Sequence, residues 1–102
     1  IKDEAKAKEF FEKACSSGEM KGCTGVGLAY AKGTGVDRDE KKAFEYFKKA
    51  CDRDNAEGCY NLGYLYDKGM GVAQDSKKSA EYYTSACSKK LPKSCYRLGG
   101  KY

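Results

Sequence analysis

Two kinds of segment in this chain show the spacing of apolar residues that an amphipathic helix requires. After Asp39 the first kind carries apolar residues at i, i+3, i+4, i+7 and i+8, namely Ala43, Tyr46, Phe47, Ala50 and Cys51. Asp39 itself is a good N-cap, because its carboxylate accepts hydrogen bonds from the first turn. The second kind follows a short turn around Asn55 and runs over residues 56–68, with an apolar stripe of Cys59, Leu62, Gly63, Leu65 and Tyr66. The pattern predicts two helices packed as a hairpin.

The hairpin recurs with a period of 36 residues. The equivalent positions include Asp3, Asp39 and Asp75; Gly27, Gly63 and Gly99; and Tyr30, Tyr66 and Tyr102. A fixed period of this size is the signature of stacked repeats. We therefore expect an all-α fold, an α/α superhelix or solenoid of three hairpins, in one domain over residues 1–102. The units span residues 3–36, 39–72 and 75–102, and the last one is truncated.

The first helices of the outer units repeat the apolar stripe of the middle one. Their residues are Ala7, Phe10, Phe11, Ala14 and Cys15 in the first unit and Ser79, Tyr82, Tyr83, Ala86 and Cys87 in the third. We expect both stripes to face the core. A glycine within a helix costs close to 1 kcal/mol relative to alanine, so the recurrence of Gly27, Gly63 and Gly99 predicts close approach of a neighbouring helix. Gly69 is expected to end its helix in a left-handed cap.

Six cysteines fall into the same register. Each cysteine at the end of a first helix lies eight residues before one at the start of a second helix, which gives the pairs Cys15–Cys23, Cys51–Cys59 and Cys87–Cys95. Of the fifteen possible pairings, this one repeats with the period and joins neighbours in sequence, so we expect three disulfides. Zinc is the competing interpretation, but the sequence has no His and no pair of cysteines at zinc-site spacing. No metal or other cofactor is predicted.

The disulfides and the charge limit the compartment in which the protein acts and the partners that it can bind. Disulfides indicate an oxidising compartment, which means a secreted or periplasmic protein. The net charge is +5, and the excess lies in residues 73–102, with seven basic and two acidic side chains. The first two units are too balanced in charge to favour nucleic-acid binding. The sequence starts at Ile1 without a signal peptide, as a mature or partial chain would, and contains no run long enough to span a membrane.

The motif Cys59-Tyr60-Asn61-Leu62-Gly63, followed by Tyr66, Lys68, Gly69, Gly71 and Val72, closely resembles the Sel1-like repeats, relatives of the tetratricopeptide repeat. The cysteines narrow the resemblance to the Helicobacter cysteine-rich protein family. The resemblance covers all three units and departs mainly at Asn61, which is Gly25 and Arg97 in the others, and at Phe44. It implies a right-handed, secreted superhelix with one disulfide per repeat. It also implies either a protein-interaction adaptor or, as for some family members, a penicillin-binding protein or weak β-lactamase.

Positions that vary between units on one face of the second helix are candidates for partner binding. In tetratricopeptide-like arrays this helix lines a concave groove. The varying positions are Lys21, Glu57 and Lys93; Thr24, Tyr60 and Tyr96; Gly25, Asn61 and Arg97; and Leu28, Tyr64 and Gly100. We expect a groove that binds a peptide or protein through Glu57, Tyr60, Asn61, Tyr64, Lys68, Lys93, Tyr96 and Arg97. The alternative is that these residues are merely exposed.

Catalysis has little support in the residues themselves. No Ser is followed three residues later by Lys, so the motif of serine β-lactamases is missing. Without His, neither a Ser-His-Asp triad nor a His-based metal centre can form. No catalytic residue is predicted, and a β-lactamase remains the alternative function. The uncovered core at the C-terminal end indicates that the array continues or that two chains associate there.

Overall fold

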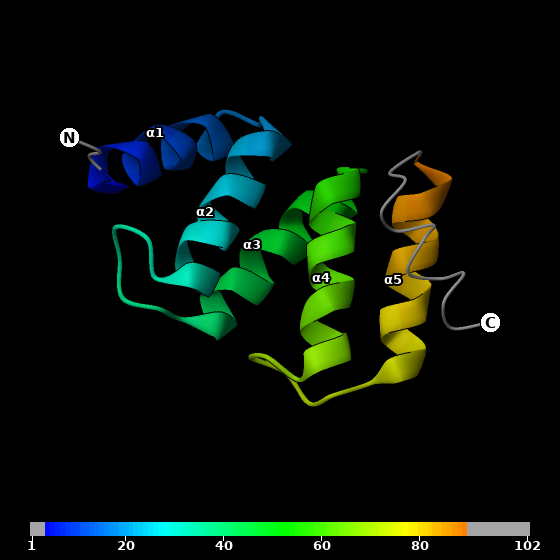
Figure 1. The fold of residues 1–102 in the computed structure, drawn as a ribbon. Coiled ribbons are helices and arrows are strands. Elements are labelled where there is room, and N and C mark those ends of the chain that lie inside the picture. Colours follow the sequence, from blue (N-terminus) through cyan, green and yellow to red (C-terminus); the bar gives the residue numbers. More distant parts are fainter. Residues whose placement is uncertain (1–3, 90–102) are drawn as a thin grey trace.

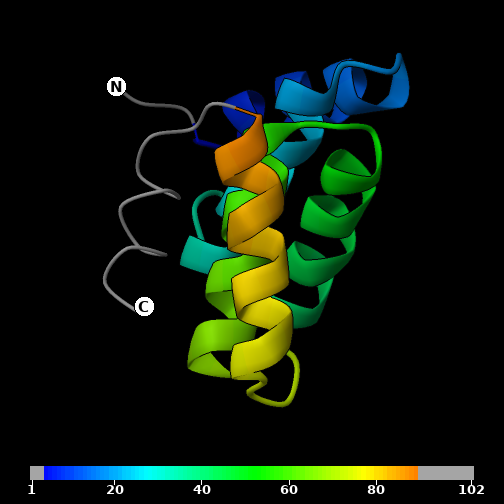
Figure 2. The ribbon, with the colours of Figure 1, turned by 90° about the vertical axis from the view of Figure 1, so that its right-hand side faces the viewer.

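The computed structural model describes residues 4–89, and this part of the chain is all helical. The five helices are α1 (Glu4–Ser16), α2 (Met20–Lys32), α3 (Glu40–Asp52), α4 (Ala56–Lys68) and α5 (Ser76–Ser88). They follow one another across the molecule from α1 at one end to α5 at the other (Figure 1). Turned by 90°, the view has α5 in front, with α3 beside it and α1 above (Figure 2). The predicted all-α solenoid of helical hairpins is confirmed.

Capping carboxylates and left-handed glycines set where several of the helices begin and end. The Asp39 carboxylate accepts a hydrogen bond from the Lys42 N–H at 3.1 Å, and Asp75 caps α5 in the same way through Lys78 at 3.0 Å. Both predicted N-caps are confirmed, while Asp3 lies outside the described residues. At the other end of the second helices, Gly33 and Gly69 take left-handed conformations with φ of 72° and 68°. A glycine adopts this conformation without the steric penalty of a side chain.

A disulfide joins the two helices of each fully described hairpin. Cys15 is bonded to Cys23 and Cys51 to Cys59, with Cα atoms 4.5 Å apart in both pairs. Cys87 is also disulfide-bonded, and its expected partner Cys95 lies outside the described residues. Each described bond closes a short loop, and such a loop restricts the unfolded chain by about 2.5 to 3 kcal/mol.

Small residues let the two helices of a hairpin approach closely beside the disulfide. A Cβ atom added to Gly22 would lie 2.6 Å from the Cβ of Ala14, and one added to Gly58 would lie 2.6 Å from the Cβ of Ala50. Real Cβ atoms do not approach so closely, so these positions require glycine. The sequence pattern alone did not indicate this role, although both glycines immediately precede a second-helix cysteine.

Consecutive hairpins meet through an aromatic ring that lies over a glycine. A Cβ atom added to Gly27 of α2 would lie 2.5 Å from the Phe47 ring of α3, and one added to Gly63 of α4 would lie 3.0 Å from the Tyr83 ring of α5. Phe47 and Tyr83 are 1% and 0% exposed. The predicted close approach at these glycines is therefore confirmed, and the neighbouring group is an aromatic side chain of the next first helix.

A second aromatic contact accompanies each of these junctions. Tyr30 stacks on Tyr46 with ring centroids 6.0 Å apart, and Tyr66 stacks on Tyr82 at 5.7 Å. A lysine of the first helix lies over the second-helix ring in both cases, Lys42 at 5.2 Å and Lys78 at 5.5 Å from the centroids. Stacked rings with a cation above them add to the stabilisation that burial alone provides.

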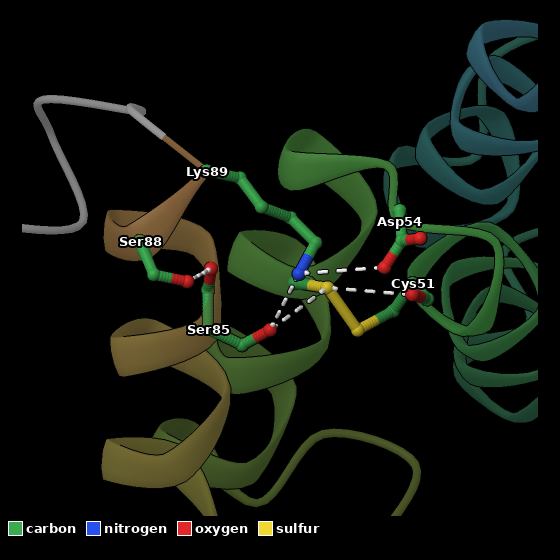
Figure 3. Close-up of polar contacts among 6 residues, drawn as sticks. Cys51, Asp54, Ser85, Ser88 and Lys89 are labelled. Atoms are coloured by element: carbon green, nitrogen blue, oxygen red, sulfur yellow. Dashed lines mark hydrogen bonds and ion pairs between the residues drawn. A yellow bond between two sulfur atoms is a disulfide. The ribbon is translucent and has the colours of Figure 1, made fainter.

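Polar groups connect α5 to the Cys51–Cys59 disulfide (Figure 3). The Lys89 ammonium lies 3.6 Å from the Asp54 carboxylate and 3.1 Å from Ser85 Oγ, and this hydroxyl faces Cys59 Sγ at 3.8 Å. Asp54 follows α3 and has a positive φ of 67°. The equivalent residue of the first unit is Gly18, so this polar cluster belongs to the second junction alone among the described junctions.

The expectation that the first-unit stripe faces the core is wrong for its two phenylalanines. Phe10 is 68% exposed and Phe11 is 37% exposed. Their equivalents in α3 and α5 are covered by the second helix of the preceding hairpin, and within residues 4–89 no such helix precedes α1. Helical periodicity marks a stripe as apolar, but burial of the stripe also requires the neighbour.

Candidate functional site

One face of α4 brings together three of the predicted groove residues. Tyr60, Asn61 and Tyr64 are each half-buried. They share one side of α4, because positions three and four apart lie on the same side of a helix. The Tyr60 ring also contacts the buried Tyr83 ring, with centroids 5.4 Å apart. Tyr60 therefore connects the surface to the core.

A depression of about 360 Å³ lies between this face of α4 and α2. Its lining combines predicted groove residues with apolar neighbours: Leu28, Ala31, Lys32, Phe47, Tyr60, Asn61, Tyr64, Leu65 and Met70. Phe47 and Leu65 are almost fully buried and form part of the hydrophobic core. The volume lies within the range of pockets that hold a side chain or a small ligand. The lining is mainly apolar, and its polar side-chain groups are the Asn61 amide, the Lys32 ammonium and the hydroxyls of Tyr60 and Tyr64.

The depression continues along α2 towards α1. Two further hollows, of about 230 and 320 Å³, share Leu28 with the first one. Phe11 lines both of them, and its ring occupies the space beside Gly25, where an added Cβ would lie 2.8 Å away. Gly25 is the first-unit equivalent of Asn61. The three hollows share Leu28 in their lining, and together we call them the α2/α4 groove.

Basic side chains outnumber acidic ones around the α2/α4 groove. Lys21 and Lys32 are exposed and line it, and Lys68 places its ammonium 5.9 Å from the centre of the Tyr64 ring. Glu57 is exposed and lines the hollow that also contains Lys21. A rim of this kind favours a partner that carries negative charge.

The structure places the predicted site residues unevenly. Tyr60, Asn61 and Tyr64 share one hollow, Glu57 lines its neighbour and Lys68 lies at the edge. The remaining predicted residues, Lys93, Tyr96 and Arg97, lie outside the described part of the chain. The α2 contribution from Ala31 and Lys32 was missed, although Lys32 is the first-unit equivalent of the predicted Lys68.

One of the varying positions, Thr24, does not lie on the exposed face of its helix. It was expected on the exposed face together with Tyr60, but it is 6% exposed. Its hydroxyl donates a hydrogen bond to the Asn55 side-chain oxygen at 2.9 Å, and the same oxygen caps α4 by accepting from the Gly58 N–H at 2.7 Å. Thr24 thus holds the two second helices together at the hollow that Thr24 and Asn55 both line. A short side chain that varies between units can still be buried when its hydroxyl has a partner.

The contact between Ser85 and Lys89 is the nearest approach to a catalytic pair among the contacts described here. The Lys89 side chain is paired with the Asp54 carboxylate, and an ammonium has no lone pair with which to accept the serine proton. The Ser85 hydroxyl in turn faces a disulfide sulfur. These contacts hold α5 against the preceding hairpin and do not activate a nucleophile.

Residues 4–89 contain neither a cluster of metal-binding side chains nor a membrane-spanning helix. This part of the chain has no group of three or more His, Cys, Asp or Glu side chains arranged to hold a metal ion. None of its helices is long and apolar enough to cross a bilayer.

The fold defines the class of protein: an α/α solenoid of disulfide-linked helical hairpins. Within this class the chain belongs to the Sel1 repeat family, whose model matches residues 1–19, 21–55 and 56–91. The family model divides the chain at other residues than our units 3–36, 39–72 and 75–102, which stay a prediction. A search of curated proteins found no match.

Solved structures with the same fold come from several bacteria. A Sel1 repeat protein from Oxalobacter formigenes has 26% identity and a TM-score of 0.89, and the match covers 100% of this chain and 42% of that one. Cysteine-rich protein B of Helicobacter pylori has 32% identity and a TM-score of 0.84, with 89% and 68% covered. A protective antigen of uropathogenic Escherichia coli strains, described as displaying an SLR fold, has 29% identity and a TM-score of 0.90, with 95% and 21% covered.

These relatives confirm the expected family and indicate the general role. Sel1 repeats generally mediate protein–protein interaction. The disulfides and the similarity to the Helicobacter protein are consistent with a location outside the cytoplasm. Neither the family match nor the descriptions of the similar structures indicate a β-lactamase.

Proposed function

We propose that this protein binds a peptide segment of a partner protein in the α2/α4 groove. The observation that carries the proposal is the convergence of Tyr60, Asn61 and Tyr64 with Leu28 and the α2 residues beside it on one apolar depression of about 360 Å³. Interaction sites combine aromatic contact area with a few placed polar groups, and this depression has both.

Each kind of side chain in the groove has a distinct task in this proposal. The depression above Phe47 and Leu65 accepts one apolar side chain of the ligand. The Asn61 amide presents both a donor and an acceptor, so it can hydrogen-bond the N–H and C=O of an extended peptide. The Tyr64 ring covers the peptide from the α4 side. Tyr96, the third-unit equivalent of Tyr60 in the sequence, stays a predicted groove residue.

The charges around the groove select an acidic segment. Lys32 lines the depression from α2, and Lys68 of α4 lies over the Tyr64 ring. The predicted groove residues Lys93 and Arg97 are basic as well. Charge-assisted hydrogen bonds to a carboxylate are roughly twice as strong as neutral ones. The preferred ligand therefore carries an apolar residue followed or preceded by Asp, Glu or a free C-terminal carboxylate. Glu57 discriminates against a uniformly acidic sequence.

The proposed place of action is the periplasm or the extracellular space. The disulfides of the first two hairpins support it, because the cytosol keeps such cysteines reduced. Loss of these bonds would weaken the groove, since α2 and α4 each carry a disulfide cysteine in the first turn. The proposed partner is therefore a secreted or surface protein.

Selection from a displayed library of random peptides tests the proposed function. The oxidised protein is the bait, and the enriched peptides are synthesised and measured by calorimetry. The double variant Asn61→Ala, Tyr64→Ala should weaken binding at least about tenfold, which corresponds to about 1.4 kcal/mol. Tyr60 is left intact because it contacts the buried Tyr83 ring.

The matched control is the double variant Lys41→Ala, Lys77→Ala. Both lysines are exposed on first helices, outside the groove lining, and their removal should leave the affinity within about twofold. Thermal melting of all three proteins should coincide within a few degrees. Retention of full affinity by the groove variant would show that the peptide binds elsewhere.

A further inference from the structure

The disulfides of the first two hairpins have different surroundings. We call Cys15–Cys23 the first bond and Cys51–Cys59 the second bond. Cys15 and Cys23 are 4% and 0% exposed, so the first bond is enclosed. In the second bond Cys59 is 0% exposed, but Cys51 is partly exposed. Thiol–disulfide exchange depends on which sulfur a thiol can reach, and the second bond is open to attack from its Cys51 side.

The places of the two cysteines in their helices favour the departure of Cys59. Cys59 lies in the first turn of α4, and Cys51 lies in the last turn of α3. The start of a helix carries a partial positive charge that stabilises a thiolate, whereas the end of a helix carries a partial negative charge. Attack on Cys51 therefore releases the better leaving group. Cys23 also lies in a first turn, that of α2, so this effect is common to both bonds.

A hydroxyl and an ammonium group distinguish the second bond (Figure 3). The Lys89 ammonium donates a hydrogen bond to Ser85 Oγ at 3.1 Å, and the Ser85 hydroxyl donates to Cys59 Sγ at 3.8 Å. Because the ammonium occupies a lone pair of Ser85 Oγ, the hydroxyl proton is left to face the sulfur. The Asp54 carboxylate also contacts Lys89, but the Asp54 side chain is 88% exposed, so water screens its charge.

The first bond has no such hydroxyl among the contacts of residues 4–89. The polar neighbour of Cys23 Sγ is the backbone oxygen of Cys15 at 3.9 Å, and Cys59 has the equivalent contact at 3.7 Å. The residue that corresponds to Ser85 at the first junction is Lys49. Lys49 is exposed and lines a hollow with Tyr30 and Tyr46. Of the two bonds, the second thus combines an accessible sulfur with a hydrogen-bond donor for the departing one.

We propose that the second bond is a thiol-exchange site, which a dithiol reductant opens while the first bond stays closed. A thiolate of the reductant attacks Cys51 Sγ, the bond to Cys59 breaks, and its electron pair leaves on Cys59 Sγ. The Ser85 hydroxyl then donates to the new thiolate. The second thiolate of the reductant attacks the reductant sulfur of the mixed disulfide and releases Cys51 as a thiolate. The reductant ends as a disulfide, and the two electrons that it loses reduce the protein bond.

Opening the second bond changes the helix that carries the proposed groove residues. Cys59 directly precedes Tyr60 and Asn61 in α4, so its release loosens the start of this helix while the first hairpin stays linked. Exchange at this site thereby weakens ligand binding in the α2/α4 groove. This consequence rests on the proposed function, whereas the exchange itself does not. The peptide affinity of the oxidised protein tests the groove, and the order of reduction tests the exchange site, so the two can fail separately.

Partial reduction of the oxidised 102-residue chain with dithiothreitol tests the inference. Samples of the folded protein are quenched at intervals with N-ethylmaleimide, and peptide mass spectrometry identifies the alkylated cysteines. The cysteines of the second bond should be labelled at least about tenfold faster than those of the first bond. Equal rates, or faster labelling of the first bond, would overturn the inference. Glutathione, a monothiol, should form its mixed disulfide at Cys51, and an adduct at Cys59 would overturn the proposed direction of attack.

Two variants test the stabilisation of the departing thiolate. Ser85→Ala and Lys89→Gln should each slow reduction of the second bond relative to the first at least about threefold, because the thiolate loses a donor or a nearby positive charge. A merely structural role predicts the opposite change, since a looser protein exposes its disulfide and is reduced faster. An unchanged or increased ratio of rates in both variants would refute the role of these two side chains.

The matched controls make the same chemical changes nearby. Ser88→Ala removes a hydroxyl from the same helix, and this hydroxyl bonds to a backbone oxygen. Lys48→Gln removes a charge from α3, where the Lys48 ammonium pairs with Asp52. Both controls should keep the wild-type ratio of rates within about twofold. Controls that slow the second bond as much as Ser85→Ala would show that the effect does not come from the Ser85 and Lys89 contacts.

Discussion

Replacement of Gly27 by alanine tests the packing rule that joins one hairpin to the next. Helix propensity alone predicts that this substitution stabilises the protein by about 1 kcal/mol. The structure predicts the opposite, because the new Cβ would lie 2.5 Å from one atom of the Phe47 ring and 2.7 Å from another. Phe47 is 1% exposed and packs in the core with Ala43, Leu62 and Leu65, so any movement of the ring disturbs these contacts or fills the depression that the ring lines.

The magnitude follows from the two opposing effects. Overpacking a well-filled core costs typically about 1 to 3 kcal/mol, and a contact of 2.5 Å with an enclosed ring belongs at the upper end. After subtraction of the gain in helix propensity, Gly27→Ala should lower the free energy of unfolding by about 2 kcal/mol. In a domain of this size, this loss corresponds to a decrease of about 8 °C or more in melting temperature.

Urea denaturation of the oxidised protein, followed by circular dichroism, measures the change. Gly63→Ala is the internal comparison, because its Cβ would lie 3.0 Å from the Tyr83 ring, and its cost should be clearly smaller. The double variant Gly27→Ala, Phe47→Leu should recover at least about 1 kcal/mol relative to the sum of the single effects. A Gly27→Ala variant that is as stable as the wild type, or more stable, would refute this packing rule.

Three further predictions concern stability. Ser79→Ala should stabilise the protein by about 1 kcal/mol, because the Ser79 hydroxyl is fully buried without a hydrogen bond to any described residue. The equivalent residue of the middle unit is alanine. A melting temperature below that of the wild type would contradict this prediction. Asn55→Ala should cost about 1 to 2 kcal/mol in urea denaturation, because one side-chain oxygen caps α4 and accepts from Thr24, and a loss below about 0.5 kcal/mol would show the cap to be dispensable. Replacement of both Cys51 and Cys59 by alanine should cost about 2.5 to 3 kcal/mol through the unfolded chain, and unchanged stability would argue against this bond as a source of stabilisation.

Much of the fold could be predicted because each unit repeats local signals. The caps at Asp39 and Asp75, the left-handed Gly69 and the cysteine spacing all act within a few residues of the chain. Local chemistry of this kind is fully encoded in a short stretch of sequence. The helix after Asn55 runs over residues 56–68 in the structure, as its apolar spacing predicts.

Features that depend on a neighbouring hairpin could not be predicted in the same way. Phe10 and Phe47 belong to the same kind of stripe, yet Phe10 is 68% exposed because no described second helix covers it. Thr24 varies between units but is buried, since its hydroxyl is directed to Asn55 of the next hairpin. Periodicity identifies equivalent positions, whereas burial depends on what packs against each of them.

The candidate site was predicted from the sequence only in part. The varying positions of the second helix indicated Asn61 and Tyr64 on α4 and Leu28 on α2, but Ala31 and Lys32 on α2 were not named. A depression between two helices exists only once their separation is set, and the Thr24 hydrogen bond and the ring over Gly27 contribute to that separation. Sequence variation alone contains no information on this distance.

Chemical-shift mapping tests peptide binding in the α2/α4 groove most directly. The oxidised, ¹⁵N-labelled protein is titrated with a peptide from the displayed library that contains one apolar and one acidic residue. The account predicts that the largest changes cluster at Leu28, Lys32, Asn61 and Tyr64, which line one depression. Changes that cluster instead on the exposed faces of α3 and α5, with the groove resonances unmoved, would contradict it.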